Sequence, residues 1–416
     1  MDKIQILGGK KLKGTVKISG AKNAALPILF ATLLTDEPCI IDNVPSLADI
    51  NTTIHFLSFL GKKVAKKKDR VFIYSNKKLK TSAPYELVRK MRASALVMGP
   101  LLARLGKVKV SLPGGCAIGT RPIDIHLEGF EKLGAKIDIK EGYVKIVANK
   151  LKGNIINLRY PSVGATENIL LASVLAKDKT IINNAAKEPE IVDLASALNA
   201  MGADVIGAGT NKISIKGVNG LIGLKHQVIP DRIEASTYLI ATAITEGNTK
   251  LVNVNPNHIK IIIKKLKYSG LSIKIVKNIV YAKWTKPLKA TSIKTGVYPL
   301  FPTDVQAQWM ALMTVVKGKS KITETVFENR FLHVPELQRL GAELTIKGNT
   351  VFINGVKSIS GAPMMVSDLR AGAALVLAGL VASGKTVISR VYHLDRGYEN
   401  LEKKLSKLGA KIQRVS

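Results

Sequence analysis

Hydrophobic and polar residues alternate in a pattern that recurs six times along the chain. The segment LSFLGKKV, which ends at Val64, returns as FEKLGAKI, LNAMGADV, LKYSGLSI, LQRLGAEL and LSKLGAKI. The glycines at the centre of these segments lie 68 to 73 residues apart, and they are Gly61, Gly134, Gly202, Gly270, Gly341 and Gly409. Each copy predicts the last turn of a helix, a glycine in the left-handed conformation after it, and an alternating strand.

A second marker recurs in step with the first. It is a polar turn followed by a strand, and it comes after an apolar helical stretch: TDEPCIIDNV, LGKVKVSLPGG, KDKTIINNA, EGNTKLVNV, KGKSKITETV and SGKTVISRV. The predicted unit is therefore helix, strand, helix, strand, strand, and six such units give an α/β fold class. The absence of a dinucleotide fingerprint and of a P-loop argues against a Rossmann protein or a GTPase.

A third feature precedes each apolar helix and carries charge. Small residues stand beside charged ones in SGAKNAALP, RKMRASALV, PSVGATENI, PDRIEASTY, FPTDVQAQW and VSDLRAGAA. Unpaired amides and the positive end of the helix dipole gather at helix N-termini, so six such starts would favour an anionic ligand. Ordinary capping by Asp, Ser and Asn is the alternative explanation. Lys22, Arg92 and Arg370 occupy matching places in three copies, which favours the ligand.

Composition and charge narrow the class of protein. The 416 residues are 46% hydrophobic and 22% charged, which predicts a folded protein, of either two domains or one large repeat assembly, rather than a disordered chain. The 63 Lys and Arg against 30 Asp and Glu give a net charge of +33, so a basic nucleic-acid-binding protein is an alternative. The lysines are scattered in pairs such as Lys62–Lys63 and Lys264–Lys265, without the interleaved aromatics of a single-strand binder. Most of this charge is therefore predicted to be solvated surface.

Neither the termini nor the cysteines indicate a membrane, a disulfide framework or a metal. The first residues form no signal peptide, and the longest apolar run, Ala371 to Ala382, is too short to span a bilayer, so a cytoplasmic protein is expected. Only Cys39 and Cys116 occur, and no Cys/His cluster has metal-ligand spacing. No metal and no other cofactor is expected.

Nine segments in the same order along the chain resemble one family: GAKNAALP, PGGCAIGTRPID, PSVGATEN, EPEIVD, PDRIEA, FPTDVQAQ, TETVFENRFLHVPELQRLGA, SDLRAGAALVLAGL and LDRGYE. They are similar to the bacterial UDP-N-acetylglucosamine 1-carboxyvinyltransferases, or enolpyruvyl transferases, over essentially the whole chain. This resemblance implies transfer of the enolpyruvyl group of phosphoenolpyruvate to the 3-hydroxyl of UDP-N-acetylglucosamine, with release of phosphate, in peptidoglycan synthesis.

The resemblance also implies a fold of two similar domains, each with three α/β units around buried helices, known as an inside-out barrel. Residues 21–229 would form the first domain, and residues 1–20 with 230–416 the second, with the active site in the cleft between them. The chain would cross between domains near Gly20 and near Pro230. The expected partners are the two small-molecule substrates, without nucleic acid or membrane, and a monomer is expected.

Three residues are implied to be catalytic. Cys116 lies in the glycine-rich loop PGGCAIG with Arg121 five residues on, and nearby cations lower the pKa of a thiol, so a proton donor or nucleophile is plausible chemistry. In the family this cysteine protonates the methylene carbon of phosphoenolpyruvate. Asp304 corresponds to the general base for the sugar hydroxyl, for which N-capping is the alternative role. Lys22, at a predicted helix start, corresponds to a phosphate ligand.

The resemblance assigns substrate binding to a larger set. Arginine suits two-point binding of carboxylate or phosphate, and several arginines stand out in a chain that favours lysine. The nucleotide-binding stretch includes Pro122, and Cys39 is predicted to be core. The substrate-binding residues implied are Asn23, Arg92, Arg121, Pro122, Ile123, Asp124, His126, Tyr160, Ser162, Val163, Gly164, Val326, Asp368, Arg370 and Arg396.

Two further alternatives share the fold. The sister enolpyruvyl transferase that acts on shikimate 3-phosphate has the same chemistry but lacks the PGGCAIG loop. An inactive paralogue would have lost the reactive residues, whereas Lys22, Cys116, Asp304 and Arg396 are present. The sequence therefore favours an active UDP-N-acetylglucosamine enolpyruvyl transferase.

The two cysteines should differ in reactivity. Cys116, beside Arg121, should react with an epoxide phosphonate such as fosfomycin, as the family resemblance implies, while Cys39 should not. Intact mass spectrometry should show one adduct on the native protein. A labelled Cys116→Asp variant would show that the reactive thiol has been assigned wrongly.

Overall fold

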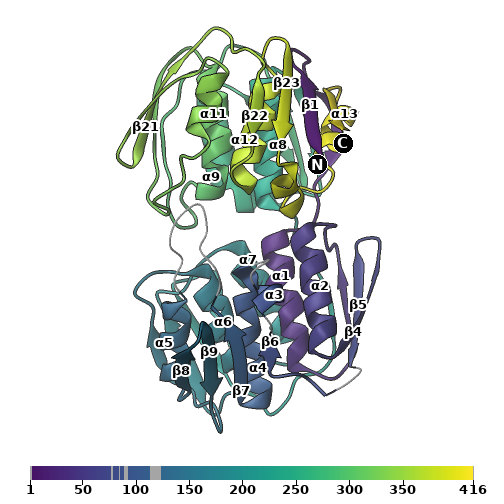
Figure 1. The fold of residues 1–416 in the computed structure, drawn as a ribbon, viewed down its shortest axis with the longest axis vertical. Helices are drawn as coiled ribbons and strands as arrows, with labels where there is room; N and C mark the ends of the chain where they lie inside the picture. Colours follow the sequence, from purple (N-terminus) through teal and green to yellow (C-terminus); the bar gives the residue numbers. More distant parts are fainter. Residues whose placement is uncertain (1, 76–77, 84, 89–91, 113–122, 416) are drawn as a thin grey trace. The chain divides into compact units, whose positions relative to one another are not determined.

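The computed structural model describes residues 2–415 apart from 76–77, 84, 89–91 and 113–122. The chain divides into two compact units (Figure 1). Among the described residues, those within 20–229 form the first unit, and those within 2–19 and 230–415 form the second unit. Each unit has its own hydrophobic core.

The described residues of the first unit form three four-stranded sheets. In spatial order they are β14 (Leu224–Gln227), β3 (Cys39–Asp42), β5 (Arg70–Ser75), β4 (Lys62–Lys67); β6 (Ser82–Ala83), β7 (Lys107–Ser111), β9 (Tyr143–Val147), β8 (Lys136–Lys140); and β10 (Ile155–Asn157), β11 (Lys179–Asn183), β13 (Lys212–Lys216), β12 (Asp204–Ile206). The helices are α1 (Lys22–Ala31), η1 (Thr32–Leu34), α2 (Ala48–Leu60), α3 (Tyr85–Val88), η2 (Arg92–Val97), α4 (Met98–Leu105), α5 (Asp124–Lys132), α6 (Val163–Ser173) and α7 (Pro189–Ala200), where η denotes a 3₁₀-helix.

The second unit repeats this arrangement within its described residues. Its sheets are β16 (Ser272–Val276), β17 (Ile279–Lys283), β15 (Asn248–Val252), β2 (Lys13–Lys17); β18 (Ile293–Lys294), β19 (Gly318–Thr323), β21 (Thr350–Gly355), β20 (Glu343–Lys347); and β22 (Pro363–Met365), β23 (Lys385–Ser389), β1 (Lys3–Leu7), β24 (Lys411–Val415). Its helices are α8 (Arg232–Ile244), η3 (Pro256–Ile259), α9 (Lys260–Ser269), η4 (Thr303–Val305), α10 (Gln306–Thr314), α11 (Val334–Arg339), α12 (Leu369–Gly379), η5 (Val391–Arg396) and α13 (Leu401–Lys407).

Every sheet has the same topology, which confirms the six repeated α/β units. Each has one parallel pair at an edge and two antiparallel pairs, as in β6–β7, β7–β9 and β8–β9. The predicted unit of five elements was incomplete, because a short edge strand also precedes each apolar helix. Strands as short as β6 and β18 have two residues each, too few for an alternating pattern to be recognised.

Strands from distant parts of the chain complete three of the sheets. The strand β2 precedes α1 in sequence but pairs with β15 of the second unit, while β14, which precedes α8, pairs with β3 of the first unit. The N-terminal strand β1 inserts between β23 and β24. Backbone hydrogen bonds therefore tie the N-terminus to the last repeat.

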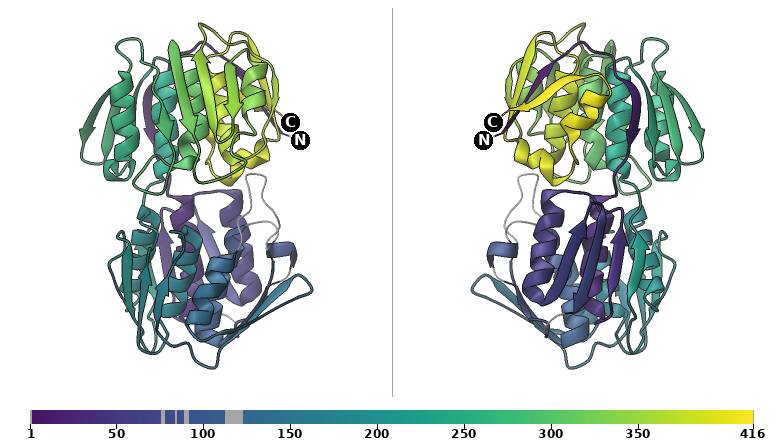
Figure 2. Two further views of the ribbon diagram at one scale, coloured as in Figure 1. Left: turned by 90° about the vertical axis from the view of Figure 1, so that its left-hand side faces the viewer. Right: turned by 90° about the vertical axis from the view of Figure 1, so that its right-hand side faces the viewer.

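The central helices of each unit are buried on all sides. Every residue of α10 is buried, and so are residues 165–173 of α6 and 370–379 of α12. In the left view of Figure 2 a sheet lies on the near face of the second unit, and in the right view a sheet lies on the near face of the first unit. A helix that is apolar over most of its surface belongs in a core, so a polar side chain on it needs hydrogen-bond partners within the fold.

The six repeat glycines adopt the predicted conformation. Their φ angles lie between 90° and 116°, in the left-handed region, at Gly61, Gly134, Gly202, Gly270, Gly341 and Gly409. In this region a side chain would clash with the backbone, and each glycine thereby lets the helix end and the chain turn into the next strand.

One lysine pair departs from the prediction of solvated charge. Lys63 is exposed, but Lys62 is only 3% exposed. The Lys62 Nζ donates to the backbone oxygen of Thr35 at 2.5 Å and to the Ser75 hydroxyl at 3.0 Å. Burial lowers the pKa of Lys62, although Asp36 opposes this shift. Lys62 is thus an exception to a prediction made for most of the charge, and it is buried because β4 turns its first side chain inward.

Gly134→Ala should test the strain at a repeat glycine. A Cβ there would meet no atom within 4 Å, so backbone conformation at φ +90° is the sole cost. The left-handed conformation should destabilise the unit by about 1–2 kcal/mol and lower its thermal midpoint by roughly 2–4 °C. Gly220→Ala, which also has open space but no positive φ, is the matched control. Equal midpoints for the two variants would contradict the assigned role.

Candidate active site

Asp304 lies in the second unit, in η4 just before the buried helix α10. Pro302 is the N-cap of this turn, so Asp304 does not have the capping role considered above. Its carboxylate instead binds two guanidinium groups: Arg330 Nη2 donates to Oδ1 at 2.7 Å, and Arg370 Nη2 donates to Oδ2 at 3.2 Å. The arginine side chains are 3% and 6% exposed, against 27% for Asp304. The carboxylate is therefore the most accessible group of this cluster.

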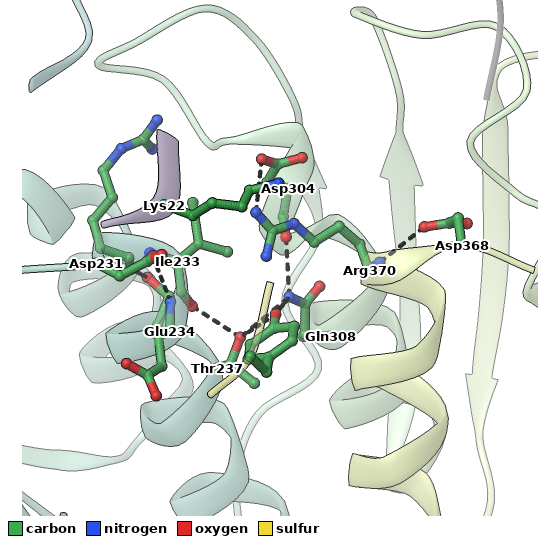
Figure 3. Close-up of polar contacts among 12 residues, drawn as sticks. Lys22, Asp231, Ile233, Glu234, Thr237, Asp304, Gln308, Asp368 and Arg370 are labelled. Atoms are coloured by element: carbon green, nitrogen blue, oxygen red, sulfur yellow. Dashed lines mark hydrogen bonds and ion pairs between the residues drawn. The ribbon is translucent and has the colours of Figure 1, made fainter. Parts of the chain in front are cut away.

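Arg370 projects from the first turn of α12. Asp368 is the N-cap of this helix, and its Oδ1 accepts hydrogen bonds from the backbone amides of Arg370 at 2.9 Å and Ala371 at 3.1 Å. Figure 3 shows the Arg370 guanidinium beside the Asp304 carboxylate. Burial lowers the pKa of Arg370, but the negative charge of Asp304 and the neighbouring Tyr398 outweigh it, so the pKa lies above its usual value.

A buried polar network lies beneath this ion pair. Gln308 Nε2 donates to the backbone oxygen of Asp304 at 3.0 Å, and it also lies 3.0 Å from the Tyr398 hydroxyl and 3.2 Å from Thr237 Oγ1 (Figure 3). The hydroxyl groups of Tyr398 and Thr237 are 3.0 Å apart. Burial raises the pKa of Tyr398, which keeps the hydroxyl a donor. The network joins α8, α10 and Tyr398, two residues after η5, and so fixes the backbone at Asp304.

Sequence reasoning missed several members of this cluster. Arg330 lies in the family-like segment TETVFENRFLH, where an arginine in a lysine-rich chain was an available signal. Gln308 and Tyr398 also lie in family-like segments, FPTDVQAQ and LDRGYE, but their residue types gave no signal, because their roles depend on contacts across the fold. His333 is 1% exposed, and burial lowers its pKa to about 4, with Asp368 opposing and Arg330 adding to this shift.

The other predicted residues of the second unit are placed on separate elements. The Val326 amide donates to Glu324 Oε1 at 2.8 Å, in the turn that follows β19. Arg396 ends η5 and is half-buried. The structure thus brings Asp304, Asp368 and Arg370 together.

In the first unit, Lys22 begins α1 as predicted. Its Nζ forms an ion pair with Asp49 Oδ2 at 3.0 Å, and the two side chains are 12% and 6% exposed. Asn23 follows it and is half-buried. A cation at a helix N-terminus can bind an anionic group, and Asp49 holds this ammonium in place.

The predicted nucleotide-binding residues of the first unit gather around α5 and α6. Asp124 begins α5 and pairs with Arg159, and Ile123 is buried just before it. Ser162 is the N-cap of α6, and its Oγ accepts from the Ala165 amide at 3.3 Å. Val163 begins this helix. Tyr160 is 42% exposed.

His126 and Gly164 lie against one another in this group. A Cβ on Gly164 would lie 3.2 Å from His126 Cε1 and 3.4 Å from Nε2. The imidazole ring therefore covers the first turn of α6 at a position where a side chain larger than that of glycine would press against it.

Three predicted residues, Cys116, Arg121 and Pro122, lie outside the residues that the structure describes. The backbone of Arg92 begins η2, but its side chain is also outside the description. Cys39 is buried in β3, which confirms that it is core, and burial raises the pKa of its thiol.

Neither a metal site nor a membrane-spanning element is found in the described ranges. Within these ranges, which leave out residues 113–122, no group of three His, Cys, Asp or Glu side chains could hold a metal ion. Among the same residues, every helix is too short or too polar to cross a membrane.

Comparisons with known proteins give matches over nearly the whole chain. A family model described as EPSP synthase (3-phosphoshikimate 1-carboxyvinyltransferase) matches residues 6–405. The chain is 66% identical to the UDP-N-acetylglucosamine 1-carboxyvinyltransferase of Endomicrobium trichonymphae over 99% of each chain. It is 54% identical to UDP-N-acetylglucosamine 1-carboxyvinyltransferase 2 of Carboxydothermus hydrogenoformans over the full length of both.

Solved structures show the same fold. The enolpyruvyl transferase NikO from Streptomyces tendae has a TM-score of 0.90 at 24% identity and covers 100% of this chain and 99% of its own. EPSP synthase from Acinetobacter baumannii has a TM-score of 0.78 at 21% identity over the full length of both chains. These neighbours confirm the predicted two-part α/β fold.

His333 should make stability depend on pH. A histidine whose pKa falls from 6.5 to about 4 on folding binds fewer protons in the native than in the unfolded state between these values. As the pH falls from about 6.5 to 4, His333 therefore lowers the free energy of unfolding by roughly 2–3 kcal/mol. Urea unfolding of the wild type and of His333→Gln should show this loss only in the wild type. Parallel pH profiles would contradict it.

Proposed function

The chain belongs to the enolpyruvyl transferase family, and on this premise we propose that it transfers the enolpyruvyl group of phosphoenolpyruvate to the 3-hydroxyl of UDP-N-acetylglucosamine and releases phosphate. This is the first committed step of peptidoglycan synthesis. The acceptor is chosen from relatives 51–66% identical over nearly their full length, all named UDP-N-acetylglucosamine 1-carboxyvinyltransferases. The EPSP synthases are 21% identical, so they support the fold but not shikimate 3-phosphate as acceptor.

The observation that carries the chemistry is the accessible carboxylate of Asp304 between two buried guanidinium groups. A general base must lie within hydrogen-bond reach of the hydroxyl that it deprotonates, and its orientation must be fixed. Arg330 and Arg370 each bind one oxygen and so fix the plane of the carboxylate. The side of the carboxylate that stays accessible can then accept the proton of the sugar hydroxyl.

The proposed reaction is an addition followed by an elimination. The 3-hydroxyl oxygen bonds to carbon 2 of phosphoenolpyruvate as its proton passes to Asp304, while carbon 3 receives a proton from Cys116. The Cys116 thiolate then takes back a proton from carbon 3 of the tetrahedral adduct, the double bond between carbons 2 and 3 re-forms, the bond from carbon 2 to the phosphate oxygen breaks, and phosphate leaves. Cationic side chains would bind the carboxylate and phosphate throughout. The residues proposed for this are Lys22, Arg92, Arg121 and Arg396.

A phosphate-release assay tests the proposed function. Phosphate should appear when the protein receives phosphoenolpyruvate with UDP-N-acetylglucosamine, and mass spectrometry should show the enolpyruvyl sugar nucleotide. Release that requires shikimate 3-phosphate instead would establish the sister activity. If no phosphate is released with either acceptor and the protein binds random DNA in a salt-sensitive way, the nucleic-acid alternative would be supported.

Asp304→Ala should separate catalysis from folding. Loss of a positioned base should lower kcat by roughly 10²–10⁴-fold, with little change in affinity for the sugar nucleotide. Asp42→Ala is the control, because Asp42, the last residue of β3, also pairs with an arginine, but that arginine, Arg70, is 51% exposed. Turnover and thermal midpoint should be measured on the same samples. If Asp304→Ala turns over normally but has a lower thermal midpoint, Asp304 has only a structural role.

A further inference from the structure

Asn168 is a fully buried polar residue that none of the assignments above includes. It lies on α6 with 0% exposure, and its side-chain amide contacts three other parts of the first unit. Oδ1 accepts from the Gly99 amide on α4 at 2.8 Å. Nδ2 donates to the backbone oxygen of Ala95 in η2 at 2.8 Å and lies 2.9 Å from His126 Nδ1 on α5.

The orientation of this amide is fixed by its backbone neighbours. The Gly99 N–H can only donate and the Ala95 oxygen can only accept, so reversing the amide would set donor against donor and acceptor against acceptor. Gly99 can approach Asn168 this closely because it has no side chain. A Cβ on Gly99 would lie 2.7 Å from Asn168 Oδ1 and 2.4 Å from its backbone oxygen. The NH₂ group therefore faces both Ala95 and His126.

This orientation determines where the proton of His126 resides. One hydrogen of Nδ2 goes to the Ala95 oxygen, and the other points at His126 Nδ1, which must then be an unprotonated acceptor. A neutral imidazole carries one ring proton, so it is on Nε2. His126 is thereby made a donor at the edge of the ring that lies over Gly164.

The first turn of α6 offers further donors beside that edge. Backbone amides of a helix's first turn have no partner within the helix, and Ser162 Oγ accepts only the third of them, from Ala165. The amides of Val163 and Gly164 and the N–H of His126 would together present donors to one acceptor with several oxygens. A phosphate group has this chemistry.

We propose that Asn168 is a positioning residue that fixes His126 in the Nε2–H form, so that its N–H binds a diphosphate oxygen of the sugar nucleotide. The choice of ligand rests on the proposed function, but the tautomer does not. If Asn168 only joined α4, α5 and α6, replacing it would change stability but not the ring nitrogen of His126 that carries the proton.

Nuclear magnetic resonance of the ¹⁵N-labelled free protein tests the tautomer directly. Long-range ¹H–¹⁵N spectra distinguish protonated from bare ring nitrogens, and His126→Gln identifies the signals among the six histidines. Spectra are recorded from about pH 8 upward until the ring is neutral, because the ordinary pKa of imidazole is near 6.5 and the carboxylate of Asn168→Asp would raise it. Nε2 should carry the proton in the wild type, and Nδ1 should carry it in Asn168→Asp, whose carboxylate can only accept. A wild-type proton on Nδ1 would overturn the proposal even if no variant folds.

Steady-state kinetics then tests the consequence for binding. With Nε2 changed from donor to acceptor, Asn168→Asp should raise the KM for UDP-N-acetylglucosamine about 10- to 100-fold, while kcat and the KM for phosphoenolpyruvate stay within about twofold. Asn199→Asp is the matched control, because the Asn199 amide also bonds to backbone on both sides, at Val205, without touching a histidine.

The two possible failures are distinguishable. A wild type that turns over normally and an Asn168→Asp variant with an unchanged KM for the sugar nucleotide would overturn the positioning role. Absence of turnover in the wild type would instead count against the proposed function, and the ring spectra would still decide the tautomer.

Discussion

Each repeat buries one apolar helix, and this burial determines where its polar groups can lie. Because α6, α10 and α12 are enclosed along their length, a polar side chain on them must lie near an end or find hydrogen-bond partners in the core. The first turns also leave backbone amides unpaired and carry the positive end of the helix dipole. The repeat therefore places its charged and capping residues where an anionic substrate could be bound, without any residue having to leave the core.

The same constraint explains why buried polar groups here are joined in networks. Removing an amide or a guanidinium from water is costly unless its hydrogen bonds are replaced. Asp304, Arg330 and Arg370 compensate one another, and Gln308 binds the backbone beneath them. In the first unit, Asn168 serves α4, α5 and α6 at once. Such networks hold side chains in one orientation, which catalysis and specific recognition both require.

The sequence predicted what depends on local chemistry. The left-handed glycines and the helix starts follow from single residues and their near neighbours, and all six glycines adopt the predicted conformation. Other features depend on pairing between distant segments. These are the two-residue edge strands, the pairing of β2 with β15 and of β14 with β3, and the insertion of β1 between β23 and β24. The contacts of Gln308, Tyr398 and Asn168 are long-range in the same way, so no spacing in the sequence could reveal them.

The distance between the sugar 3-hydroxyl and Asp304 decides whether this carboxylate can act as the base, and a crystal structure of the complex with UDP-N-acetylglucosamine would measure it. We expect the 3-hydroxyl oxygen within about 2.6–3.2 Å of an Asp304 carboxylate oxygen, with Arg330 still bound to the other. A sugar whose 3-hydroxyl points away from Asp304, toward another base or toward solvent, would show that Asp304 is not the base.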